Sequence, residues 1–71
     1  MQYKQVKSTS IAQVGYDRFT ATLEIHFLSG RHYRYYLVPQ RCYRDLLAAD
    51  SKGRFFLSKI RPAGFPYQRL Q

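Results

Sequence analysis

Apolar and polar residues alternate most regularly along residues 20–27. Successive side chains of a strand point to opposite faces of a sheet, so this stretch predicts a half-buried strand. One face carries Ala21, Leu23, Ile25 and Phe27, and the other carries Thr20, Thr22, Glu24 and His26. Residues 11–16 predict a shorter strand before it, in which Gly15 indicates a bulge or the close approach of another segment.

Residues 31–38 predict the second arm of a hairpin, joined to the first by a loop at 28–30 with Gly30 in the left-handed conformation. A three-residue loop places Glu24 opposite Arg34, and a two-residue loop would place Ile25 there instead. Since a slip of one residue moves every side chain to the other face, the three-residue loop is favoured. The remaining pairs are then Ile25 with Tyr33, Leu23 with Tyr35, Ala21 with Leu37, His26 with His32, and Thr22 with Tyr36. Tyr33, Tyr35 and Leu37 are expected to face the core, and His32, Arg34, Tyr36 and Val38 the other side.

Two short helices are predicted after the hairpin. Residues 39–49 start at a proline, which suits a first helical turn, and carry apolar residues at helical spacing. Ser51 is a suitable N-cap for a second helix over residues 52–60, which Pro62 ends. Gly53 in its first turn lowers helix propensity, so we expect another segment to approach closely there.

These elements predict an α+β fold: a three-stranded antiparallel β-meander followed by two short α-helices packed on one face. The helices are expected to cover the face with Leu23, Ile25, Tyr33 and Tyr35, because that face is too apolar to remain in water. Residues 1–71 are expected to form one domain, with residues 1–7 and 66–71 flexible.

The charge narrows the class of partner. Lys and Arg number 12 and Asp and Glu number 4, a formal charge of +8. This surplus favours polyanions, nucleic acid first and an anionic membrane or an acidic protein second. Cys42, the one cysteine, has no internal partner and suits a reducing compartment. No apolar run reaches the ~20 residues that span a bilayer, and no signal-like stretch opens the chain, so we expect a cytoplasmic location without membrane contact.

Two groups of residues are candidates for nucleic-acid binding. The sheet face offers rings for stacking and cations for phosphates in His26, His32, Arg34 and Tyr36. The helices add Arg41, Arg44, Lys52, Arg54 and Arg61, and the helix start at Ser51 offers free amides to a phosphate. The alternatives are a solvated strand face, a purely capping Ser51, and an Arg61 paired with Asp45 or Asp50.

Catalytic chemistry finds little support in the residues. The carboxylates Asp17, Glu24, Asp45 and Asp50 lack the spacing of an acid–base or metal-binding pair. Cys42 lies on the half-buried side of a predicted helix, where a thiol is usually an apolar filler. Two histidines meeting across the hairpin do not complete a zinc site, which needs four ligands. We therefore expect no enzymatic activity, no cofactor and no metal.

An ordered set of short motifs, spread from about residue 6 to residue 70, resembles the KTSC domain. The set comprises Ser8-Thr9-Ser10-Ile11, Gly15-Tyr16, Phe27 before Gly30, Tyr33-Arg34-Tyr35, Val38-Pro39, Tyr43, Ser51-Lys52-Gly53, Phe55-Phe56 and Ile60-Arg61. Two positions depart from the family's pattern. Leu57 stands where relatives have an asparagine, and Phe65 stands where they tend to have a tyrosine.

The resemblance implies a domain found at the C-terminus of some lysyl-tRNA synthetases and as a small stand-alone bacterial or phage protein. It implies no established catalytic activity and a suggested role in RNA binding. Together with the charge, it predicts a small basic module that binds RNA or single-stranded nucleic acid, as a monomer or weak dimer. The alternative is a protein-interaction module whose basic surface or edge strand meets an acidic partner or its own copy.

Overall fold

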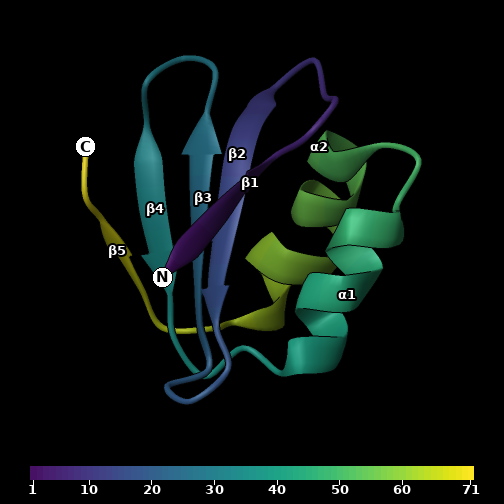
Figure 1. Cartoon of the computed structure of the whole chain (residues 1–71). Helices are drawn as coiled ribbons and strands as arrows, with labels where there is room; N and C mark the ends of the chain where they lie inside the picture. The colour runs from purple at the N-terminus through teal and green to yellow at the C-terminus, as the bar shows by residue number, and fades with distance from the viewer.

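The computed structural model describes all 71 residues as an antiparallel sheet with a helical layer against one face (Figure 1). The strands follow one another in space as in sequence: β1 (Gln2–Gln5), β2 (Ile11–Asp17), β3 (Thr22–Phe27), β4 (His32–Tyr35) and β5 (Tyr67–Arg69). The helical layer comprises α1 (Gln40–Ala48), α2 (Lys52–Phe55), the π-helical turn η1 (Phe56–Ile60) and the 3₁₀ turn η2 (Arg61–Ala63). The predicted α+β class is confirmed.

The prediction of three strands is wrong, because β1 and β5 extend the sheet at its two edges. β1 pairs with β2, and β5 pairs with β4, both antiparallel. Every residue of these two strands is exposed to solvent. An edge strand pairs on one side only and needs no buried side-chain face, so its sequence lacks the alternation that identified the inner strands.

The central hairpin has the predicted register. Its partners are Leu23 with Tyr35, Glu24 with Arg34, Ile25 with Tyr33, and His26 with His32. The loop is also as predicted: the Phe27 amide donates to the Arg31 carbonyl over 2.9 Å, and Gly30 has a φ of 96°. Residues 22–27 and 32–35 therefore alternate between the two faces as predicted. Thr20 and Ala21, which were predicted to begin this strand, lie instead in the turn before β3, where Ala21 has a left-handed φ of 54°.

Beyond Tyr35 the prediction is wrong for two residues. Leu37 adopts a left-handed φ of 59° and is 70% exposed, whereas Val38 is completely buried. A left-handed residue turns the chain and breaks the alternation, so Val38 points into the core in place of Leu37. The predicted pairing of Ala21 with Leu37 is replaced by a hydrogen bond from the Val38 amide to the Ala21 carbonyl, 2.8 Å long.

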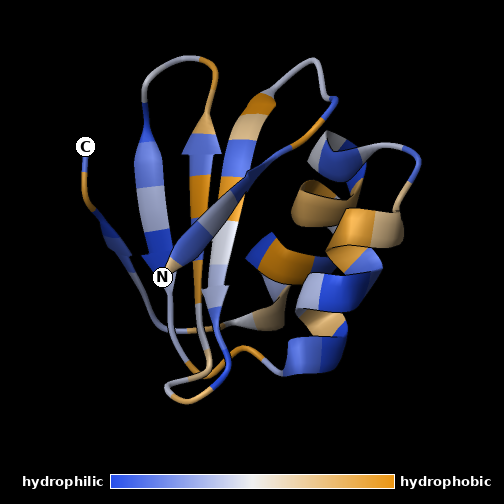
Figure 2. Cartoon of the chain, viewed as in Figure 1, coloured by the Kyte–Doolittle hydropathy of each residue, from blue (hydrophilic) through white to orange (hydrophobic).

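The core lies between the sheet and the helices, where apolar segments of both layers face each other (Figure 2). Its buried members are Ile11, Val14, Leu23, Ile25, Tyr35, Val38, Leu46, Phe56 and Ile60. The helices thus cover the face of the sheet that carries Leu23, Ile25, Tyr33 and Tyr35, as predicted. None of them has the length and apolar composition to cross a bilayer.

The second helical segment begins as predicted and ends differently. The Ser51 hydroxyl accepts from the Arg54 amide over 3.3 Å, which confirms the N-cap. A Cβ on Gly53 would lie 2.5 Å from the Ser10 Oγ, so the expected close approach is made by the segment before β2. The α-helix passes into η1 and η2, and Gly64, with a φ of 80°, ends the helical path after Pro62.

Candidate functional site

The open face of the sheet contains a buried carboxylate in place of a free basic surface. The Glu24 side chain is only 4% exposed and accepts four hydrogen bonds. Arg34 donates two of them to Oε2, from Nε over 2.8 Å and from Nη2 over 2.6 Å. The Tyr3 hydroxyl and His26 Nε2 bond to Oε1 over 2.7 and 3.1 Å.

The two histidines of this face stack on each other, as the hairpin pairing requires. Their ring centroids lie 3.8 Å apart and their planes differ by 10°. Both ring nitrogens of His26 are occupied, since Nδ1 lies 2.9 Å from the side-chain amide of Gln13 and Nε2 contacts Glu24. Tyr3 of β1 tilts against the His26 ring at 4.9 Å, so a terminal strand covers part of this face.

Charge on this face is internally balanced. Burial by itself raises the pKa of Glu24, but the hydrogen bonds from Tyr3, Arg34 and His26 outweigh it, and the pKa of the carboxyl lies below its usual range. The same contact, with a smaller part from Tyr36, raises the pKa of Arg34. The Tyr36 hydroxyl donates to Gln68 over 3.0 Å. Of the groups predicted to bind a partner here, Arg34 and His26 are thus bonded to Glu24, His32 stacks on His26, and Tyr36 is bonded to Gln68.

The predicted helix-side residues do not form one cluster. Arg41 and Arg44 are exposed on α1, and neither lines the cleft that is described below. Lys52 donates to the Ala49 carbonyl over 2.6 Å and so caps the end of α1. Arg54 and Arg61 line a cleft between the sheet and α2–η1, and neither forms a salt bridge. The suggested pairing of Arg61 with Asp45 or Asp50 is therefore absent.

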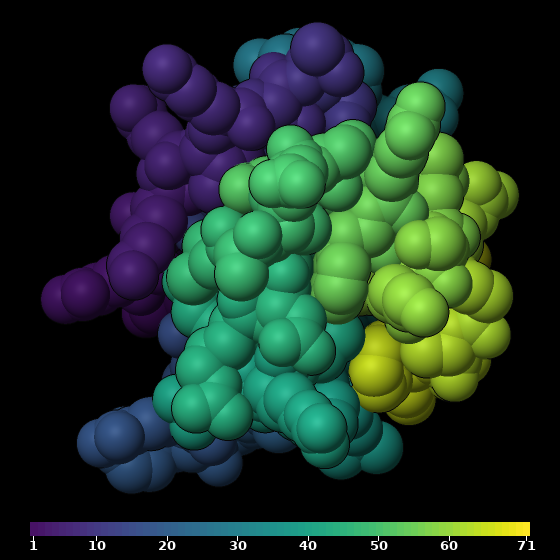
Figure 3. Space-filling view, turned by 90° about the vertical axis from the view of Figure 1, so that its right-hand side faces the viewer, coloured from purple at the N-terminus to yellow at the C-terminus, as the bar shows by residue number.

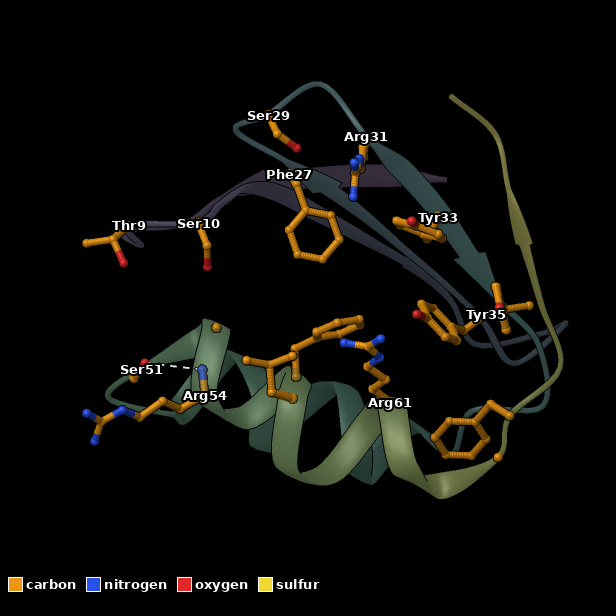
Figure 4. Close-up of a pocket in the computed structure, with 16 residues that line it drawn as sticks. Thr9, Ser10, Phe27, Ser29, Arg31, Tyr33, Tyr35, Ser51, Arg54 and Arg61 are labelled. Carbon is orange, nitrogen blue, oxygen red and sulfur yellow. Dashed lines mark hydrogen bonds between the residues drawn. The ribbon is translucent and has the colours of Figure 1, made fainter.

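This cleft has a volume of about 860 Å³, within the range of roughly 300–1,000 Å³ typical of ligand sites. It opens between the end of the β3–β4 hairpin and the second helical segment (Figure 4). Its lining residues are Thr9, Ser10, Phe27, Ser29, Arg31, Tyr33, Tyr35, Ser51, Gly53, Arg54, Phe56, Leu57, Arg61, Gly64, Phe65 and Tyr67. We refer to it as the aromatic cleft.

Aromatic rings form a connected wall of the aromatic cleft. Tyr35 lies at its centre, with ring centroids 5.5 Å from Tyr67, 5.8 Å from Phe56 and 6.4 Å from Tyr33. Phe27 continues the wall at 5.2 Å from Phe56. Tyr67 is 64% exposed, so an aromatic surface at the mouth of the cleft is open to a ligand.

The polar lining of the cleft is cationic and hydroxylic, with no carboxylate. In Figure 4 the Arg31 side chain points into the cleft from the sheet, and Arg61 rises towards Tyr35 from the helical side. Arg54 lines the cleft but directs its guanidinium outwards. Burial raises the pKa of the Tyr35 hydroxyl, and the nearby positive charge of Arg61 partly offsets this.

A catalytic centre is not evident in these side chains. No three residues among His, Cys, Asp and Glu are grouped as metal ligands would be. Cys42 is half-buried, and burial raises the pKa of its thiol, which keeps the less nucleophilic protonated form. The lining of the aromatic cleft contains no carboxylate, histidine or cysteine.

Comparison with known proteins identifies the family. The model of the KTSC domain matches residues 7–65 of this chain. The chain belongs to the KTSC family. A KTSC domain protein of Yersinia pestis has a crystal structure that superimposes with a TM-score of 0.89 at 37% identity, covering 99% of this chain and 97% of that one.

Three relatives in sequence accompany this structural neighbour. An uncharacterized protein of Stutzerimonas stutzeri is 39% identical over 99% of both chains. A protein of Tsukamurella paurometabola is 42% identical over 80% of this chain and 85% of its own. A lysine–tRNA ligase of Nostoc punctiforme is 40% identical over 84% of this chain but only 10% of the ligase. The predicted family resemblance is confirmed.

Many residues that carry the KTSC resemblance gather at the aromatic cleft. They are Thr9, Ser10, Phe27, Tyr33, Tyr35, Ser51, Gly53, Phe56 and Arg61. Tyr33 and Tyr35 were both predicted to lie in the core. Tyr35 is buried there, whereas Tyr33 is partly buried and packs against it. No role was predicted for Arg31. The one signal in the sequence for this cleft was the set of family motifs. These motifs lie on separate segments that only the tertiary fold brings together.

Proposed function

We propose that this KTSC domain binds RNA or another single-stranded nucleic acid, and that it does so in the aromatic cleft. The observation that carries the proposal is the pairing of an aromatic wall, open at Tyr67, with Arg31, Arg54 and Arg61 in a cleft without carboxylates. Unpaired bases stack on aromatic rings, and arginines bind phosphates through paired N–H groups. The overall charge of +8 attracts the strand from a distance.

The cleft is a better candidate than the sheet face predicted from sequence. On that face Arg34 is bound to Glu24, the nitrogens of His26 are occupied, and Tyr36 is bound to Gln68. A nucleic acid would have to break these bonds before gaining its own. The guanidinium groups of Arg31 and Arg61 have no protein hydrogen bond to lose.

The family relationship adds support from one relative. The Nostoc protein is named as a lysine–tRNA ligase, so a KTSC region there forms part of a protein that acts on an RNA. This chain spans about a tenth of that ligase, and the ligase's activity is not assigned to it. RNA is accordingly the first polymer to test.

The test is a titration of fluorescently labelled single-stranded RNA with the protein at two salt concentrations. Binding should weaken as salt rises, because each phosphate that is neutralised releases counterions. Arg31→Gln and Arg61→Gln should each weaken binding, whereas Arg41→Gln, which changes the same charge on exposed α1, should have a small effect. Absence of binding at low salt, or equal effects of all three variants, would reject the cleft as the site.

A protein partner is the second candidate, favoured by a different surface. Phe19 is 86% exposed in the β2–β3 turn, with Arg18 stacked over its ring at 5.0 Å, and the edges β1 and β5 are unpaired on their outer sides. The β2–β3 turn projects from the body in Figure 3. Capture from cell lysate with and without nuclease distinguishes the two candidates. Partners that persist after nuclease treatment and are lost with Phe19→Ala would favour this one.

A further inference from the structure

A second hollow adjoins the aromatic cleft. Its volume is about 390 Å³, and it is lined by Lys7, Ser8, Thr9, Asp50, Ser51 and Lys52. Thr9 and Ser51 line both hollows, so the two adjoin at these residues. In Figure 3 the N-terminal segment, in purple, lies directly beside the green helical segments, and this junction holds the second hollow. We call it the lysine hollow.

Chemical character changes in order along the two hollows. In Figure 4, Tyr33 and Tyr35 lie at one end of the aromatic cleft, with Arg31 and Arg61 nearer its middle. Thr9 and Ser51 lie at the opposite end, with their hydroxyls towards the space between sheet and helix. The lysine hollow, which has no apolar lining, continues from there. Tyrosine rings, the guanidinium groups of Arg31 and Arg61, hydroxyls and then ammonium groups follow one another, with the Phe27 ring between Arg31 and Ser10 and the Arg54 guanidinium at the hydroxyl end.

This order matches the repeating chemistry of a single strand. We propose that the two hollows form one track for a short single-stranded RNA. A terminal base stacks on the exposed ring of Tyr67, which the buried Tyr35 supports from behind, the next phosphate lies between Arg31 and Arg61, and a later phosphate reaches the lysine hollow. Hydroxyl groups between these points offer donors to phosphate and ribose oxygens. The proposal rests on the proposed function and adds to it a path and a minimum length.

The lysine hollow also contains the one carboxylate of the track, that of Asp50. Lys52 donates one N–H to the Ala49 carbonyl and keeps two others for a ligand. Lys7 and Asp50 are exposed and have no side-chain hydrogen bond within the protein, so replacing either leaves the fold's bonding unchanged. A phosphate in this hollow is attracted by Lys7 and repelled by Asp50, which gives the two replacements opposite effects.

The experiment compares ligands of increasing length. Adenosine monophosphate and labelled di-, tri- and tetranucleotides of single-stranded RNA are titrated into the unmodified protein, Lys7→Ala and Asp50→Asn. For the longer strands, Lys7→Ala should weaken binding about two- to fivefold and lower the salt slope by roughly 0.7, and Asp50→Asn should tighten binding by a similar factor. Adenosine monophosphate, which reaches only the aromatic cleft, should bind all three proteins alike.

The control is Lys59→Ala, because Lys59 is exposed on η1 and lines neither hollow. It should leave the affinity for every length unchanged within about twofold. If longer strands bind but neither Lys7 nor Asp50 alters their affinity, the track is rejected and the proposed function stands. If no strand of any length binds the unmodified protein, the proposed function fails together with the track.

Discussion

Arg34 of β4 stands directly opposite Glu24 of β3, and two nitrogens of its guanidinium donate to a single oxygen of that buried carboxylate. The side chain of Glu24 is 4% exposed, and that of Arg34 is 38% exposed. Burying a carboxylate is costly unless it is paired and hydrogen-bonded, and Arg34 supplies both needs. The arginine that looked most available in the sequence is therefore part of the fold.

Replacing Glu24 by glutamine should destabilise the protein. The neutral amide keeps the size of the side chain but loses charge-assisted bonds from Arg34 and His26, and its NH₂ group cannot accept a bond. We expect a decrease of about 2–3 kcal/mol in the free energy of unfolding, measured by urea denaturation. Asp45→Asn, at an exposed carboxylate on α1, is the matched control and should change it by less than about 0.5 kcal/mol. Equal losses in both variants would contradict a special role for Glu24.

The same carboxyl should make stability depend on pH. Its pKa in the folded protein lies below the ordinary value of 4.5, so the unfolded chain takes up the proton first as the pH falls. The contribution of Glu24 is complete above the ordinary pKa and is lost as the pH falls through the folded-state pKa. Denaturation from neutral pH down to about pH 3 should show a steeper decline for the unmodified protein than for Glu24→Gln. Parallel curves for the two proteins would show that the pKa of Glu24 is not lowered on folding.

The pairing of Glu24 with Arg34 could be predicted from the sequence, and the further contact of Glu24 with Tyr3 could not. Side-chain period and loop length together determined which residues face each other across β3 and β4. The pattern gave no sign that Tyr3 would reach Glu24, because Tyr3 belongs to an exposed edge strand with no apolar alternation. Gly15 carried the only local hint: a Cβ there would lie 2.7 Å from the Tyr3 ring.

Tyr67 and Tyr36 offer a matched pair of substitutions that separates the two faces of the sheet. Tyr67→Ala removes an open ring from the aromatic cleft and should weaken binding of single-stranded RNA roughly five- to hundredfold, since base stacking contributes about 1–3 kcal/mol. Tyr36→Ala removes a tyrosine that is bonded to Gln68 and does not line the cleft, so it should change the affinity by less than about twofold. Fluorescence anisotropy measures both, with thermal melting as a check on folding. A larger effect at Tyr36 would return the binding site to the open sheet face.

Replacing Leu37 by a residue that readily adopts a left-handed backbone conformation should not lower the stability of the fold. A left-handed φ costs an ordinary residue roughly 1–2 kcal/mol, and the exposed Leu37 side chain has little burial to lose. We expect Leu37→Gly to be at least as stable as the unmodified protein, because relief of strain offsets the flexibility gained by the unfolded chain. Leu37→Val, which is β-branched, should be less stable by about 1 kcal/mol. Equal melting temperatures for Gly and Val would show that the left-handed turn is not maintained in solution.

The aromatic cleft lay beyond prediction from the sequence for a topological reason. Thr9 precedes β2, Arg31 precedes β4, Arg61 begins η2 and Tyr67 belongs to β5. No local period relates these segments, and only the docking of the second helical segment against the sheet brings them together. The charge and the family motifs predicted a class of partner, and the packing brings together the residues of the cleft that we propose binds it.

Nuclear magnetic resonance of the labelled 71-residue chain, titrated with single-stranded RNA, tests the central claim most directly. The largest amide shift changes should map to the lining of the aromatic cleft: Thr9, Ser10, Arg31, Tyr33, Gly53, Arg61 and Tyr67. These changes should diminish as salt is added. Changes concentrated at Glu24, Arg34 and Tyr36, or along the exposed side of α1 at Arg41 and Arg44, would contradict it.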